Sequence, residues 1–141
     1  MKRTIASAFF ALATLITGTA MAQNQAVKAN VPFDFTVGNA HVPAGTYTIS
    51  SAETQNIIML RSDSGKVSIF GIGYADDNQS QASKLVFDKQ GDRYFLREIL
   101  CAKADMNLQL PVSKSEKQAQ HMQASVPQDK DEVEIALNEI R

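Results

Sequence analysis

Three carboxylates on one predicted hairpin have the residue types and spacing that could support catalysis. Asp88, Asp92 and Glu98 lie close together in the sequence, and paired carboxylates are the catalytic groups of most glycoside hydrolases. The same residues flank a turn and alternate with basic residues such as Arg93 and Arg97. That pattern is typical of charge pairs between neighbouring strands on a solvated face. We favour the charge pairs and assign no catalytic residue.

Metal-ligating residues are sparse. His41 and His121 are far apart, and neither has a second histidine, a cysteine or a carboxylate at the spacing of a zinc site. Residues 76–78 (Asp-Asp-Asn) resemble the start of a calcium loop, but Gln81 stands where glycine is needed and Phe87 where glutamate is needed. The sequence therefore predicts a solvated loop here, with no metal and no cofactor.

Nucleophile and phosphate motifs are also missing. Residues 71–73 (Gly-Ile-Gly) lack the third glycine of a dinucleotide loop, since residue 76 is Asp76. No Gly-x-Ser-x-Gly elbow occurs. The single cysteine, Cys101, ends an apolar strand, where a buried and inert thiol is expected. A reactive thiol or an intermolecular disulfide stays open as the alternative.

The elements that would position such residues begin after an expected signal peptide at residues 1–22. Lys2 and Arg3 precede an uncharged apolar run at residues 5–16, and Ala20-Met21-Ala22 fits a signal-peptidase site. The run is too short for a transmembrane anchor. We expect an exported bacterial protein, periplasmic or extracellular, with one domain at residues 23–141 and no membrane span after cleavage.

Charge and cysteine content narrow the classes of partner. The signal segment holds two of the 14 Lys and Arg and none of the 15 Asp and Glu, so the mature chain carries a net charge of −3. A mildly acidic chain without a basic run argues against nucleic acid as partner. With one cysteine, no intramolecular disulfide can form.

Alternating patterns predict short strands through most of the mature chain. Residues 27–37 alternate apolar and polar side chains, with Thr36 on the polar face, and Pro32 predicts an edge position or a bulge there. Further strands are expected at 46–50, 57–61 and 66–72.

A hairpin follows at residues 84–88 and 93–101, where Gly91 can supply the positive φ of the turn. Six strands in quick succession predict a mainly all-β fold, an antiparallel sandwich or small barrel of about seven strands, and not βαβ units.

The C-terminal part changes character. Ser113 and Glu116 form a capping box for a surface helix at about 113–124 that has almost no apolar face. Residues 132–138 fit both a strand and a helix. We favour the strand, because a β-rich fold needs a return strand to cover an edge.

Several blocks together resemble a family of short exported, functionally uncharacterised proteins of Acidobacteria-type soil bacteria. The blocks cover nearly all of the mature chain and lie at residues 31–35, 42–48, 83–87, 91–96 and 110–117. The resemblance implies export, a β fold and a strand at the C-terminal end, and it supplies no catalytic residue.

These observations favour a non-enzymatic exported protein that binds a partner or belongs to the cell envelope. The first alternative is a carrier of a small apolar ligand inside a barrel. Its lining would come from four aromatic residues, Phe33, Phe35, Phe87 and Phe95. These phenylalanines fill a solid core in the simpler interpretation. The second alternative is a hydrolase that uses carboxylates. The identity of any ligand or partner is not predicted.

Overall fold

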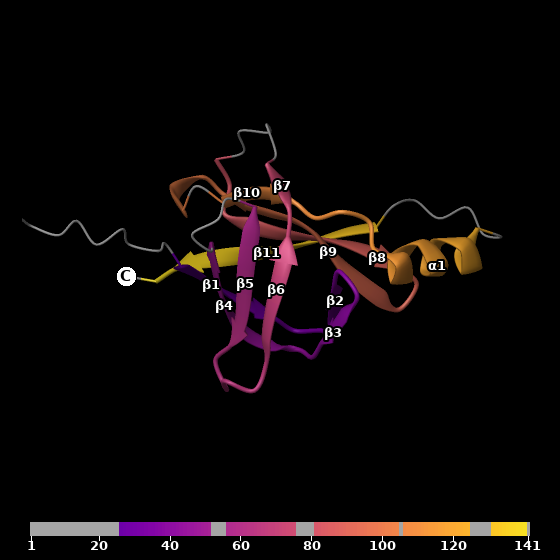
Figure 1. Cartoon of the computed structure of the whole chain (residues 1–141), viewed down its shortest axis with the longest axis horizontal. Coiled ribbons are helices and arrows are strands. Elements are labelled where there is room, and N and C mark those ends of the chain that lie inside the picture. Colours follow the sequence, from indigo (N-terminus) through magenta and orange to yellow (C-terminus); the bar gives the residue numbers. More distant parts are fainter. Residues whose placement is uncertain (1–25, 52–55, 76–80, 105, 125–130, 141) are drawn as a thin grey trace, which may run out of the picture.

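The computed structural model describes residues 26–51, 56–75, 81–104, 106–124 and 131–140. The expected signal peptide and the Asp-Asp-Asn segment at 76–78 lie outside these residues. The described residues form eleven strands, one short 3₁₀ helix and one α-helix (Figure 1). Their bounds are β1 Ala26–Val31, β2 Phe35–Val37, β3 Ala40–Val42, β4 Gly45–Ser51, β5 Ile57–Ser62, β6 Ser68–Ile72, β7 Tyr74–Ala75, β8 Lys84–Gln90, β9 Arg93–Cys101, η1 Ala102–Ala104, β10 Met106–Gln109, α1 Lys114–Gln123 and β11 Asp131–Glu139.

The strands form one sheet that is nearly closed into a barrel. Its order is β3-β2-β9-β8-β11-β1-β4-β5-β6, and β10 pairs with both β7 and β9. Because β7 follows β6 after a single residue, Gly73, the β7–β10 pairing brings the far end of the sheet back to β9. The mainly β fold expected from the alternating pattern is confirmed, and it takes the form of a barrel with one surface helix. Among the strands that the structure describes, every pairing is antiparallel except the one between β2 and β9.

The expected strand at 27–37 is broken where Pro32 predicted an irregularity. β1 ends at Val31 and β2 begins at Phe35. β1 pairs with β4 on one side and with β11 on the other, so it is not an edge strand. The assignment of Thr36 to the solvated face is wrong, because Phe35, Thr36 and Val37 are all buried. The reason is that β2 leaves the path of β1 and pairs with β3 and β9 instead.

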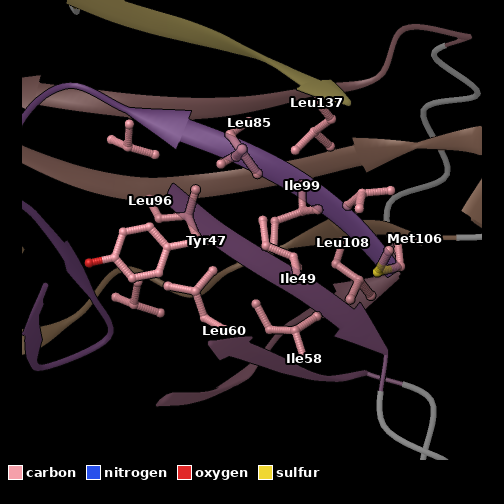
Figure 2. Packing of buried hydrophobic residues seen from close by; sticks show 14 of the residues in the cluster. Tyr47, Ile49, Ile58, Leu60, Leu85, Leu96, Ile99, Met106, Leu108 and Leu137 are labelled. Atoms are coloured by element: carbon pink, nitrogen blue, oxygen red, sulfur yellow. The ribbon is translucent and has the colours of Figure 1, made fainter. Parts of the chain in front are cut away.

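Apolar side chains from opposite walls of the barrel meet in its interior. Tyr47 and Ile49 of β4 point toward residues of β8 and β9, among them Leu85 and Ile99 (Figure 2). The Tyr47 hydroxyl donates a hydrogen bond of 2.6 Å to the Pro43 carbonyl, so its polar end is satisfied within the turn before β4. Burial of these groups is the main source of stability for a chain without an internal disulfide.

The two elements of the C-terminal part match their predictions. α1 has Ser113 as its N-cap. β11 is a strand, and it extends one residue beyond the expected 132–138 at each end. It does not cover an edge, because it lies between β1 and β8 and joins the two parts of the sheet.

Several short strands were not predicted: β2 and β3 as a separate hairpin, β7, and β10. Each has only two to four residues, so the alternation is too short to separate a strand from a loop. β10 pairs with Glu98–Cys101 of β9, and β2 pairs with Tyr94 and Phe95 of the same strand. These additions decide how the barrel closes. Within the described part of the chain, no helix is long and apolar enough to span a bilayer.

Candidate functional site

An arginine at a β-bulge is the centre of a partly buried charge cluster on the outside of the barrel. In the β8–β9 ladder Val86 lies opposite Glu98 and Phe87 opposite Leu96, so Arg97 has no residue opposite it. A bulge bends the strand and redirects the side chain of the extra residue. The consequence is visible in the burial pattern, since Leu96 and Ile99, three residues apart, both belong to the core.

The guanidinium of Arg97, on β9, bonds to β8, to α1 and to Leu110, the residue that follows β10. Its Nε and Nη2 donate to Asp88 Oδ2 at 2.9 and 2.8 Å, and its Nη1 donates to the Leu110 carbonyl at 3.2 Å. Nη2 also donates to Glu116 Oε1. The side chains of Arg97, Asp88 and Glu116 are 13%, 15% and 3% exposed, so this cluster is shielded from solvent. A shielded cluster of this kind costs several kcal/mol when one partner is lost.

The first turn of α1 completes the cluster. The Ser113 hydroxyl accepts a hydrogen bond of 3.1 Å from the Glu116 backbone N–H, which is one half of the expected capping box. Burial raises the pKa of the Glu116 carboxyl above its ordinary value of 4.5. The charge of Arg97 and a hydrogen bond from the Ser113 backbone oppose this rise, while the neighbouring Asp88 carboxylate adds to it. Glu116 therefore holds a proton more readily than an exposed glutamate.

A polar groove of about 730 Å³ lies beside this cluster, over β8, β9 and β10. Its lining includes Asp88, Arg97 and Glu98, together with Gln109 of β10 and Glu132 of β11. Glu116 does not line this groove, and its side chain is only 3% exposed. The carboxyl whose pKa is raised, that of Glu116, is therefore not one of the carboxyls that line the groove.

A second groove, of about 540 Å³, adjoins the first at Leu110 and Pro111. One wall is β6, and the other is the turn of the β2–β3 hairpin at residues 37–40. No lining residue has an ionisable side chain. On the outer face near this groove, Phe70 and Ile72 are 67% and 65% exposed, and Tyr74 is 63% exposed. Exposed apolar groups that gather in one place mark interaction surfaces more often than scattered ones do.

The structure separates most residues that the sequence singled out for chemistry. Asp88 pairs with Arg97, Asp92 is exposed at the hairpin turn, and Glu98 lines the polar groove. These three carboxylates do not converge on one point. His41 is exposed with Nε2 3.8 Å from Asp34 Oδ2.

His121 is also exposed, on α1. In the described ranges no cluster of His, Cys, Asp or Glu has the geometry of a metal site. Cys101 is a free, buried thiol, 3.6 Å from the Ser83 hydroxyl. The expectation of a buried thiol is confirmed.

The four phenylalanines considered as a ligand lining do not surround a common space. Phe35 and Phe87 are core residues with ring centroids 5.3 Å apart, and Phe33 packs on Phe87 at 5.2 Å. Phe95 is buried outside this cluster, and its ring lies 5.3 Å from the Arg93 guanidinium. Edge-to-face contacts of this kind are those of packed aromatic side chains.

Sequence reasoning missed the role of Glu116 as a buried charge and the exposed apolar face of β6. The three-residue spacing between Leu96 and Ile99 was the available signal for the bulge at Arg97, since strict alternation would have placed Glu98 in the core. Comparison of this chain with protein-family models, curated proteins and solved structures finds no match.

Proposed function

We propose that this protein is an exported, non-enzymatic binding protein that recognises a partner in the cell envelope on its outer surface. The observation that carries the proposal is a run of exposed apolar side chains: Phe70 and Ile72 line the uncharged groove, and Tyr74, next on β7, lines the adjoining polar groove. Such groups are costly to leave in water unless a partner covers them. Export itself rests on the residue pattern at 1–22.

The two alternative functions have weaker support. A carrier needs space inside the barrel, whereas the proposed lining residue Phe35 packs against both Phe87 and Tyr47. A carboxylate hydrolase needs two accessible carboxyls that converge on one point, whereas Asp88 is bonded to Arg97, Asp92 lies at the hairpin turn and Glu98 lines the polar groove. We therefore place recognition on the outer face.

Co-sedimentation with envelope fractions tests the proposal. The mature protein is mixed with outer-membrane vesicles or with peptidoglycan sacculi, both prepared from the source bacterium. We expect binding that is lost in the triple variant F70S/I72S/Y74S and kept in Met122→Ser. Met122 is the matched control, because it is 83% exposed and lines neither groove.

Three results would contradict the proposal. The first is equal binding by the triple variant and the wild type. The second is an apolar ligand retained in native mass spectrometry of protein secreted by its own bacterium, which would favour the carrier. The third is turnover of a glycoside that is lost on Asp88→Asn, which would favour the hydrolase.

A further inference from the structure

We infer that the groove between β6 and the β2–β3 turn binds an uncharged, extended polypeptide segment that adds a strand to β6. This inference rests on the proposed function and names the class of partner. It starts from the sheet order, in which β3 and β6 are the two end strands. The turn of the hairpin that contains β3 and the strand β6 line this groove together. The groove is therefore the gap at which the barrel remains open.

The hydrogen bonds between β5 and β6 determine which backbone groups face the gap. The Ser62 N–H donates to the Val67 carbonyl at 2.8 Å, and the Gly73 N–H donates to the Asn56 carbonyl at 2.8 Å. In an antiparallel pair, the residues bonded to the neighbouring strand alternate along the chain. Residues 67, 69, 71 and 73 therefore bond to β5, and residues 68, 70 and 72 direct their N–H and C=O groups away from it.

Immediately after β6, the same edge of the chain is already paired, because β7 pairs with β10. Tyr74 pairs with Gln109 of β10, and Ala75 pairs with Leu108. Within the described residues, no strand continues this pairing along Ser68–Ile72. An added segment would lie in line with β10 and would extend the pairing over about five residues. Unpaired strand edges are templates for such additions.

The side chains around the gap define the chemistry of the segment. β6 carries no charge and no proline, the two devices that usually protect an edge strand. On the outer side, Phe70 and Ile72 would flank the segment, and on the inner side Gly71 is packed closely against Ile58 and Val37. A charged segment would lose hydration here without gaining a partner. The groove thus fits apolar, β-forming residues.

The opposite wall favours a single segment over the edge of a second barrel. The Gly38 carbonyl in that wall accepts a hydrogen bond of 3.4 Å from the Ser115 hydroxyl of α1, so the turn is tied to the helix. The Leu110 N–H donates to the Arg97 carbonyl at 2.7 Å, which ties the floor to β9. A groove with two walls and a floor accepts one extended chain, whereas a second barrel would bring a whole sheet to the same edge.

Proline substitution at Ile72 separates backbone recognition from side-chain recognition. The Ile72 N–H faces the gap, so Ile72→Pro removes one groove-facing donor and no bond between β5 and β6. Ile72→Thr is the matched control, because it also shortens the apolar side chain but keeps the N–H. The probe is a capped heptapeptide of alternating valine and threonine, and its control is the same peptide N-methylated at alternate residues.

We expect the unmodified peptide to slow hydrogen exchange at the amides of Ser68, Phe70 and Ile72 in the full mature protein. Binding measured by fluorescence anisotropy should be about fivefold to tenfold weaker in I72P than in I72T. The N-methylated peptide should bind weakly to both variants. Circular dichroism and thermal unfolding of I72P establish that the barrel is folded.

Several outcomes would overturn strand addition. They are no protection of these amides at about 1 mM peptide, equal binding of the N-methylated peptide, and equal affinity of I72P and I72T. Concentration-dependent dimers that disappear in I72P would assign the edge to a second copy of this chain instead. If envelope binding depends on Phe70 and Tyr74 but I72P and I72T behave alike, the proposed function stands and strand addition fails.

Discussion

The two adjoining grooves differ in how their groups are satisfied. In the polar groove, the charges of Arg97 and Asp88 are bonded to each other and the guanidinium also bonds the Leu110 carbonyl. In the apolar groove, the backbone groups of Ser68, Phe70 and Ile72 are directed away from β5, and the outer side chains of Phe70 and Ile72 are exposed. The charged groups of the first groove bond to one another and stabilise the fold. The edge of β6 in the second groove has no neighbouring strand among the described residues. A volume alone would not have distinguished them.

The two grooves nevertheless share part of their lining. Both are lined by Leu110 and Pro111. Arg97 contacts Leu110 twice, through its guanidinium and through its backbone carbonyl. The charge cluster therefore supports the floor of the apolar groove, and changes at Arg97 should affect both stability and binding. Changes at Phe70 and Ile72, the exposed apolar side chains of β6, should affect binding alone.

The largest effect is expected for Arg97→Ala. The substitution leaves two neighbouring carboxyls shielded from solvent without their cation, which should lower the free energy of unfolding by about 3–5 kcal/mol. Urea denaturation followed by circular dichroism measures it. Arg93→Ala is the control, since Arg93 is exposed and should contribute about 1 kcal/mol or less. Equal losses in the two variants would contradict the structural role of the cluster.

A smaller loss is expected for Gly71→Val, the position in the apolar groove where packing is already tight. A Cβ at Gly71 would lie 3.0 Å from Ile58 Cγ1 and 3.5 Å from Val37 Cγ1. Overpacking of this kind should cost about 1–3 kcal/mol in thermal or chemical unfolding. Ser68→Val on the exposed face of the same strand should cost nothing measurable. A fully stable G71V would show that Ile58 moves aside freely.

The Glu116→Gln variant should change the pH dependence of stability. The pKa of Glu116 is raised in the folded state, so the folded state binds its proton more tightly. The resulting stabilisation is fully present below the ordinary pKa of 4.5 and is lost as pH rises through the raised pKa. Glutamine is neutral at every pH and can still accept from Arg97.

We therefore expect the stability difference between E116Q and the wild type to shift in favour of E116Q as pH rises through this window. Urea midpoints measured from pH 4 to pH 8 would follow it, with Gln118→Glu as an exposed control on the same helix. A pH-independent difference would indicate that Glu116 titrates as in the unfolded chain.

The smallest stability effect is expected for the double variant F70S/I72S. Both side chains are more than half exposed, so the unfolding free energy should change by about 0.5 kcal/mol or less for each. Partner binding should nevertheless be lost. A large destabilisation would mean that these side chains belong to the fold, and the contrast between the two grooves would then fail.

The order and type of the main elements were predictable from local patterns. The alternation at 84–88 and 93–101 and Gly91 gave a hairpin that the structure retains, with Gly91 at a φ of +60°. Ser113 begins the helix as expected. Four short strands could not be predicted, because two to four residues show too little periodicity: β2, β3, β7 and β10.

The sites were less predictable than the fold. Asp88 and Arg97 were both noted in the sequence as surface charge pairs, and they do pair. Their shielding depends on the bulge and on the docking of α1, which brings Glu116 from 19 residues away along the chain. No local pattern encodes that approach.

The sequence by itself determined most of the inward-facing residues of the longer strands, because side chains alternate along a regular strand and burial of apolar groups is favourable. Thr36 and the bulge at Arg97 are the exceptions. The sequence also determined where the helix begins, because capping is a local hydrogen bond. Only the tertiary structure decided how the sheet curves back on itself, which charges are shielded and where the barrel stays open. Those features depend on contacts between segments far apart in the chain, and each such contact forms only when the strands on both sides are already in register.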